Sequence, residues 1–198
     1  MKALITRVFV YVTLLAGVVL FAAPAGAAPG LLPPVPSLDV PRYMGAWYQL
    51  AAVPQPFNLE CARDTQARYT LLDARNVRVQ NTCTTWNGGT NMIVGNARVT
   101  DPATNAQLHV SFPEVPFQGS PDGPTNYVVT YIADDYSWAF VGDPLRFSGF
   151  VLSRTRAVSE DRWVEIRAVV ESRGYNSCFL LTSPTTGGRQ DIRPLCTV

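Results

Sequence analysis

Lysine and histidine are almost missing from this chain of 198 residues. Lys2 is the only lysine and His109 the only histidine, and 16 basic residues face 15 acidic ones. A chain with neither a basic excess nor a polyacidic run lacks the charge that nucleic-acid binding needs, so we expect no nucleic-acid partner. With one histidine there is no H-E-x-x-H motif, and G-x-S-x-G and the P-loop are absent too.

The remaining titratable residues offer little to a catalytic mechanism. His109 lies in LHVSF, where the apolar residues alternate with it, so we expect it on the outside rather than in a functional role. Asp134 and Asp135 are adjacent, and on a turn they indicate loop residues rather than an acid/base pair. We therefore expect that the protein is not an enzyme and that it binds no cofactor.

Long apolar runs are confined to the N-terminus. Lys2 and Arg7 precede VFVYVTLLAGVVLFAA, and small residues (AGAA) follow it. This pattern predicts a cleaved signal peptide over residues 1–28, the alternative being a retained membrane anchor. Because no cysteine lies near the cleavage site, we expect no lipid anchor and a location that is secreted or in the cell envelope. The bias toward Arg, Ala and Pro indicates a bacterial source.

Cysteine is sparse as well. The chain has Cys61, Cys83, Cys178 and Cys196. An even number in an exported chain predicts two disulfides, with three pairings open. A metal site is the alternative, but the spacings are long and histidine is nearly absent, so we expect none.

Strand signals recur at short intervals after a Pro-rich lead-in over residues 29–37, which we expect to lie loosely on the surface. The domain that follows covers residues 38–198. Its predicted strands are 46–53, 65–72, 76–83, 95–101, 106–112, 126–134, 138–143 and 147–155. Short turns favour antiparallel neighbours, and eight up-and-down strands close most naturally into a barrel. The predicted fold is therefore all-β.

One helix interrupts the strands. Ser159 is a good N-cap, Gly174 a good stop, and an apolar stripe runs between them. The stripe consists of Trp163, Ile166, Val169 and Val170. Such a face must be covered, so we expect the helix to lie on the outside of the barrel. A last strand is predicted over residues 177–183.

Alternation along the strands predicts which side chains face the barrel interior. This predicted ligand-binding set is Gln49, Ala51, Val53, Tyr127, Val129, Tyr131, Ala139, Val141, Phe150 and Leu152. Small residues beside large ones leave room for one small ligand. The alternative is a filled core without a cavity.

Three short segments resemble the conserved regions of the lipocalins. GAWY (Gly45–Tyr48) is similar to their G-x-W-Y signature, IADDYSWAFVG to their second region, and FVLSRT to the third, which ends here in Arg154. The segments QARYTL, LHVSFPEVPF and VLSRTRAVS bring the chain close to the bacterial lipocalins and apolipoprotein D. The resemblance spans residues 38–182.

The resemblance implies structural roles for its motif residues. Trp47 should close the narrow end of the barrel, with Arg154 packed across its ring. Gly45 should allow a tight entry into the first strand, and Tyr48 should point outward under the helix. In that barrel Cys61 opens the second strand and Cys83 ends the third, which favours Cys61–Cys83 with Cys178–Cys196 stapling the C-terminal tail. An apolipoprotein-D-like Cys61–Cys196 bond remains the alternative.

The function implied is that of a monomeric binding protein. It would hold a small lipophilic ligand of the fatty acid or lysolipid class inside the barrel for transport or storage, with peripheral membrane contact as a further partner. Gln49, Tyr127 or Tyr131 would fix the head group near the mouth. The alternatives are a lipid-modifying enzyme on the same barrel and a surface module that uses the loop over residues 114–126.

Overall fold

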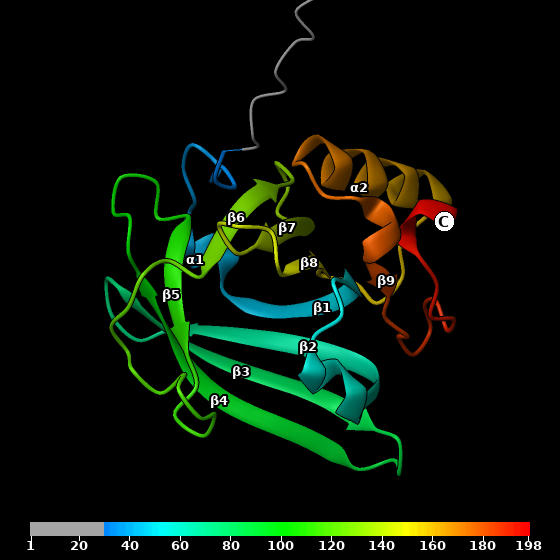
Figure 1. Ribbon diagram of the computed structural model, residues 1–198, viewed down its shortest axis with the longest axis horizontal. Coiled ribbons are helices and arrows are strands. Elements are labelled where there is room, and N and C mark those ends of the chain that lie inside the picture. The colour runs from blue at the N-terminus through cyan, green and yellow to red at the C-terminus, as the bar shows by residue number, and fades with distance from the viewer. Residues whose placement is uncertain (1–29) are drawn as a thin grey trace, which may run out of the picture.

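An antiparallel barrel accounts for most of the chain (Figure 1). The computed structural model describes residues 30–198, so the predicted signal peptide lies outside the described residues. The barrel strands are β1 (Gly45–Ala52), β2 (Cys61–Leu71), β3 (Asn76–Thr85), β4 (Thr90–Val99), β5 (Gln107–Ser111), β6 (Tyr127–Ile132), β7 (Trp138–Gly142) and β8 (Gly149–Ser153). Each pairs with the next in the sequence, and β1 pairs with both β8 and β2 to close the ring. The predicted eight-stranded up-and-down barrel is confirmed.

Two strands begin earlier than the alternation predicts. β2 begins at Cys61 rather than at residue 65, and β4 begins at Thr90 rather than at residue 95. Both extensions lie where polar residues are frequent and where the strands keep exposure on both faces. Without one buried face, the apolar alternation that marks a strand disappears.

The predicted last strand is much shorter. A 3-10 helix occupies Ser177–Phe179, and only β9 (Leu181–Thr182) is extended. β9 pairs with Ala51 and Ala52 of β1. β2 pairs with β1 only at Gly45 to Tyr48, which leaves the same edge of β1 free further along the strand. β9 occupies that free part of the edge.

The predicted helix is confirmed as α2 (Glu160–Ser172), packed against the barrel. The Ser159 side chain accepts a hydrogen bond from the Arg162 N–H, and Gly174 adopts the positive φ of 80° that ends the helix. α2 lies outside the wall formed by β6, β7 and β8, while β2, β3 and β4 form the opposite wall (Figure 1).

The Pro-rich segment is more firmly attached than predicted. Leu32, Val35 and Leu38 are buried, and their N–H groups donate to carbonyl oxygens of Pro144, Val129 and Thr104. A one-turn helix, α1 (Val40–Tyr43), then leads into β1. A Pro-rich stretch is expected to be extended with a solvated backbone, yet the residues between the prolines keep their N–H groups and can be held by them.

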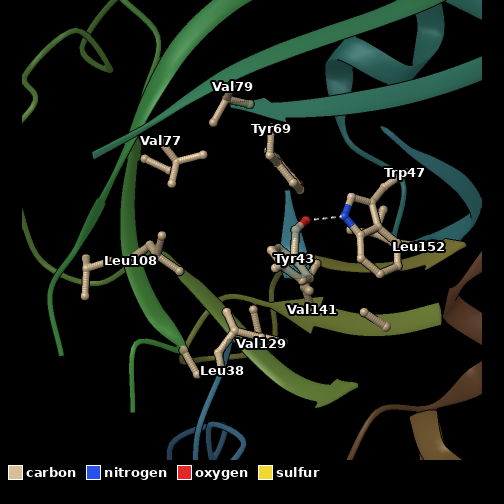
Figure 2. Close-up of a cluster of buried hydrophobic side chains, with 14 of the residues drawn as sticks. Leu38, Tyr43, Trp47, Tyr69, Val77, Val79, Leu108, Val129, Val141 and Leu152 are labelled. Atoms are coloured by element: carbon tan, nitrogen blue, oxygen red, sulfur yellow. Dashed lines mark hydrogen bonds between the residues drawn. The ribbon is translucent and has the colours of Figure 1, made fainter. Parts of the chain in front are cut away.

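Two hydrophobic clusters lie on opposite faces of the barrel wall. The inner cluster brings together side chains from all round the barrel, with Tyr43 near its middle (Figure 2). The outer cluster lies between the wall and α2 and includes Trp138, Phe140 and Ile166. The helix thus covers the outer face and leaves the interior to the strands and the N-terminal segment.

Two β-bulges change which residues face the interior. The β1–β8 register shifts between Gln49 and Ala51, and the β6–β7 register shifts between Val129 and Tyr131. An extra residue reverses the alternation beyond it. Ala51, Val53 and Tyr131 accordingly belong to the outer cluster, so the prediction that these three face the interior is wrong.

Candidate functional site

The narrow end of the barrel is closed by Trp47 and Arg154. The Trp47 side chain is fully buried, and the Arg154 guanidinium carbon lies 3.7 Å from the centroid of its ring. Arg154 also donates hydrogen bonds to the carbonyl oxygens of Ala46, Arg42 and Tyr136. The contact with the Trp47 ring is the one that the resemblance implied, and through the carbonyl contacts the same cation joins α1, β1 and the β6–β7 turn.

Gly45 and Tyr48 flank this closure. Gly45 has a φ of 96°, and a Cβ placed there would lie 3.3 Å from the Arg154 guanidinium. Tyr48 lies on the outer face as predicted, but its ring faces Arg156, at 4.7 Å, rather than the helix. Tyr48 is not among the side chains that pack against the outer cluster.

Three tyrosines meet above the closed end. The Tyr127 hydroxyl lies 2.8 Å from that of Tyr43 and 3.1 Å from that of Tyr69. The rings of Tyr43 and Tyr69 are stacked, with centroids 5.5 Å apart, and Tyr43 also contacts Trp47. We call Tyr43, Tyr69 and Tyr127 the tyrosine trio. It joins α1, β2 and β6 across the interior.

Burial keeps the tyrosine trio uncharged. It raises the pKa of Tyr69 to about 12, and it raises the pKa of Tyr43 and Tyr127 well above the ordinary value. Loss of a second proton is further opposed because each phenolate would lie close to its neighbours. The trio can therefore donate and accept hydrogen bonds but carries no charge near neutral pH.

The interior is more accessible above the tyrosine trio. Leu152, Val129, Ala139 and Val141 are buried, all at 5 % exposure or less. Tyr127 and Phe150 keep partial exposure, and so do Val110 and Phe112, which pack on the same cluster. Solvent thus reaches the upper part of the inner wall, whereas the floor is filled by side chains.

Two polar side chains also face the barrel interior. Gln49 is buried, and its amide donates to the Ser183 hydroxyl at 2.7 Å, which ties β1 to the tail. Asn81 shares the face of Val77 and Val79 by alternation along an unbroken stretch of β3. Its Oδ1 is buried and has no hydrogen-bond partner within residues 30–198.

The structure therefore places seven of the ten predicted residues on the inner face. These are Gln49, Tyr127, Val129, Ala139, Val141, Phe150 and Leu152. The predicted set does not include four further inward residues, Tyr69, Asn81, Val110 and Phe112. Alternation would have identified them if it had also been applied to the second, third and fifth predicted strands. Tyr43 gave no such signal, because it enters the barrel from a helical turn.

The other titratable candidates lie outside the barrel interior. His109 faces the β5–β6 loop, with Nδ1 2.7 Å from the Pro124 carbonyl oxygen and Nε2 3.1 Å from that of Ser120. Asp134 and Asp135 are exposed turn residues, and the Asp135 carboxylate accepts from the Ser137 N–H. The described part of the chain contains no cluster of three metal-ligating side chains. Nor does any of its helices have the length and apolarity needed to cross a membrane.

Both favoured disulfides are present. Cys61–Cys83 joins the start of β2 to the end of β3, and Cys178–Cys196 joins the tail to the 3-10 helix before β9. The Cys61–Cys196 alternative is not formed. Two disulfides are typical of proteins in oxidising compartments.

Two hollows lie on the surface rather than in the barrel. One, of about 390 Å³, is formed by the start of α2 and the tail and is lined by Arg156, Trp163 and Arg189 among others. The second, of about 400 Å³, lies beside α1 at the closed end. Arg189 is paired with Asp191 and Glu160 and faces the Trp163 ring, and Arg156 is paired with Asp64, so both arginines of the first hollow already have a carboxylate partner.

Comparison with known proteins gives one consistent result. The family model described as a lipocalin-like domain matches residues 38–185. Temperature-induced lipocalin-1 of Arabidopsis thaliana is 36% identical over 152 residues, covering 76% of this chain and 81% of that protein. The outer membrane lipoprotein Blc of Escherichia coli K12 is 32% identical, covering 72% and 76%.

Solved structures agree on the fold. Insecticyanin from the tobacco hornworm Manduca sexta superposes with a TM-score of 0.59 at 16% identity, covering 84% of this chain and 98% of that one. At that identity the likeness concerns the fold alone. The two chains share the arrangement of the strands around the barrel interior.

Proposed function

Because the chain belongs to the lipocalin family, we propose that it binds a small lipophilic molecule of the fatty acid or lysolipid class inside the barrel, for transport or storage. The observation that supports this most directly is the inner wall, which is mostly apolar and partly exposed above a filled floor. Burying an acyl chain there would contribute about 25 cal/mol per Å² of apolar surface.

The head group would lie at the mouth in this proposal. Tyr131 cannot hold it, because its hydroxyl lies outside the barrel, 3.3 Å from the Glu165 carboxylate. The Gln49 amide is already engaged with Ser183. Since no lysine lies in the barrel either, an anionic head group would keep its hydration rather than enter the interior.

Native mass spectrometry of the protein purified from its own host tests this function. We expect a lipid of that class to be retained, at one molecule per chain, and identified after extraction. Protein that carries no lipid, and that also takes up none of a panel of fatty acids and lysolipids after delipidation, would contradict the proposal.

We further propose a secreted or envelope location without a lipid anchor, as a monomer. The two disulfides support an oxidising compartment. The apolar stretch and small residues before residue 29 support cleavage of a signal peptide. N-terminal sequencing of the exported protein checks this, and a first residue before Ala27 or a covalently bound lipid would contradict it.

Peripheral contact with a lipid surface is part of the same proposal. Phe57, Leu59, Trp86, Met92 and Phe147 are each more than half exposed. They come from the β1–β2 segment, the β3–β4 hairpin and the β7–β8 loop, which an up-and-down barrel brings to one end. Exposed apolar groups that surround the mouth suit a surface from which a lipid is collected.

A vesicle flotation experiment tests that contact. We expect the protein to float with phosphatidylcholine vesicles, and Leu59→Ser with Trp86→Ser to reduce the bound fraction several-fold. Leu72→Ser is the matched control, because Leu72 is 58% exposed but lies in the β2–β3 turn at the opposite end. Equal losses in both variants would contradict a contact at the mouth.

A further inference from the structure

The tyrosine trio has more hydrogen-bonding capacity than it uses. Each phenol carries one proton and can also accept, so three hydroxyls hold three protons. The two contacts within the trio use two of them. No other group of the described chain is bonded to these three hydroxyls, so one proton and several lone pairs remain.

The members of the tyrosine trio differ in burial. Tyr43 and Tyr69 are nearly fully buried, at 4 % and 8 % exposure, whereas Tyr127 keeps partial exposure. Tyr127 is also the residue that bridges the other two. The least buried member is therefore also the one whose hydroxyl touches both others, so a new partner at Tyr127 would affect the whole trio.

The only cation that acts on the tyrosine trio in the described chain is Arg154, and it is weakly available. Its charge favours the phenolates of Tyr43 and Tyr69, yet burial outweighs it and their pKa values stay raised. Each guanidinium nitrogen already donates to a carbonyl oxygen, of Ala46, Arg42 or Tyr136, and one face lies on Trp47. A carboxylate brought down to the trio would lose its hydration and gain only this engaged cation in return. A neutral oxygen would lose far less.

Asn81 adds an independent observation. Its Oδ1 is buried on the inner face of β3, and no residue from 30 to 198 donates a hydrogen bond to it. A buried acceptor left unpaired costs free energy that a donor from a ligand would recover. The described interior thus contains an unused donor and an unused acceptor, either of which an oxygen atom or hydroxyl of a ligand could pair with and a methyl group could not.

We propose that the tyrosine trio is a subsite for a neutral oxygen, a hydroxyl or carbonyl, carried on the tail of the bound lipid. The subsite rests on the proposed lipid-binding function and narrows it. The ligand class becomes an oxygenated acyl chain whose head group stays at the mouth. A plain acyl chain would set its methyl end against three phenols.

Equilibrium dialysis of the delipidated protein tests this subsite, with each acid quantified by mass spectrometry. The acids are hexadecanoic acid, its 12-hydroxy and 16-hydroxy derivatives, and hexadecanedioic acid. We expect one of the hydroxy acids to bind about 2- to 12-fold more tightly than hexadecanoic acid, the range that one net hydrogen bond supplies. We expect the diacid to bind more weakly than hexadecanoic acid, because its deep carboxylate would lose its hydration and find only the engaged Arg154 as a counter-ion.

Two variants connect the effect to the trio. Tyr127→Phe and Tyr69→Phe each remove one hydroxyl, and we expect either to abolish the preference while hexadecanoic acid still binds. Tyr131→Phe is the matched control, because it changes the same atoms on the same strand but on the outer face. It should leave the preference unchanged.

The outcomes separate this subsite from the function it rests on. If all the acids bind but neither hydroxy acid is favoured, or if the preference survives in both trio variants, the subsite is overturned and lipid binding stands. If none of the acids binds to the delipidated wild-type protein, the proposed function fails and the subsite fails with it.

Discussion

At the scale of single residues, one arginine organises the closed end of the barrel. Arg154 contacts the Trp47 ring and three backbone carbonyl oxygens contributed by separate segments. Arg156, two positions later, also lies over an aromatic ring, that of Tyr48, but on the outer face with a side chain that is 47% exposed. Both arginines place a guanidinium over an aromatic ring, but Arg154 is more buried than Arg156, so comparing their variants separates the effect of burial.

Arg154→Met should destabilise the fold by about 2–4 kcal/mol, since it removes charge-assisted hydrogen bonds and the ring contact. Arg156→Met should cost less than about 1 kcal/mol, because exposed ionic contacts contribute little. Urea unfolding at neutral pH, followed by tryptophan fluorescence, measures both. A loss of similar size in the two variants would mean that Arg154 does not organise the closed end.

The tyrosine trio gives the fold a dependence on alkaline pH. Tyr69 has a pKa of about 12 in the fold and 10.0 ordinarily, and the pKa values of Tyr43 and Tyr127 are raised too. A raised folded pKa favours the protonated form, so the stabilisation is complete below about pH 10 and is lost as the pH rises toward about 12.

We therefore expect the free energy of unfolding to fall between pH 10 and 11, where the folded Tyr69 is still protonated. Tyr69→Phe should show a shallower fall, by up to about 1.4 kcal/mol per pH unit for the group removed. Urea midpoints at pH 8.5, 10 and 11 measure this. Identical slopes in wild type and variant would contradict the role of burial at Tyr69.

At the scale of elements, alternation predicted the barrel correctly and failed at two points. The strands and seven interior residues followed from the period of two, because one face of most strands is buried, and the helix followed from its caps and its apolar stripe. Ala51, Val53 and Tyr131 did not follow, because bulges in β1 and β6 reverse the faces beyond them. A bulge depends on how a strand pairs with its partner. No residue type in LAAV (residues 50–53) or TYIA (residues 130–133) predicts one.

Ala51→Leu distinguishes the two faces of β1. Ala51 is fully buried in the outer cluster, so the larger side chain should destabilise the protein by about 1–3 kcal/mol through overpacking against the helix side. We expect faster hydrogen exchange in α2 and an affinity for hexadecanoic acid within about twofold of wild type. A marked loss of affinity with unchanged exchange in α2 would place Ala51 inside the barrel instead.

At the scale of the whole molecule, the C-terminal tail is part of the wall. β9 pairs with β1, the Ser183 hydroxyl accepts from Gln49, and the Thr186 N–H donates to the Asp64 carboxylate at 2.8 Å. The tail thus fills the gap where β2 separates from β1. Cys178–Cys196 holds it in place across 18 positions of the sequence.

Replacing Cys178 and Cys196 together by Ser should cost about 3 kcal/mol, the value expected for closing a loop of this length. We expect the loss to appear first as faster hydrogen exchange over residues 181–198, with β3 and β4 still protected. Replacing Cys61 and Cys83 is the matched comparison, and there the loosened region should be the β2–β3 hairpin. Unfolding of both regions at the same rate in both variants would contradict a locally anchored tail.

The position of β1 also has a consequence for how the barrel is assembled. Gln49 pairs with Leu152, and Ala52 with Leu181, so the first strand finds these partners more than a hundred residues further along the chain. Contacts of such separation make folding slow, because the ends of a long loop must meet before any pairing is gained. Until Leu181 has arrived, β1 keeps an unpaired edge that another chain could occupy. The strand that begins the barrel is therefore among the last to be enclosed, and the interval before its closure is when the chain is most open to aggregation.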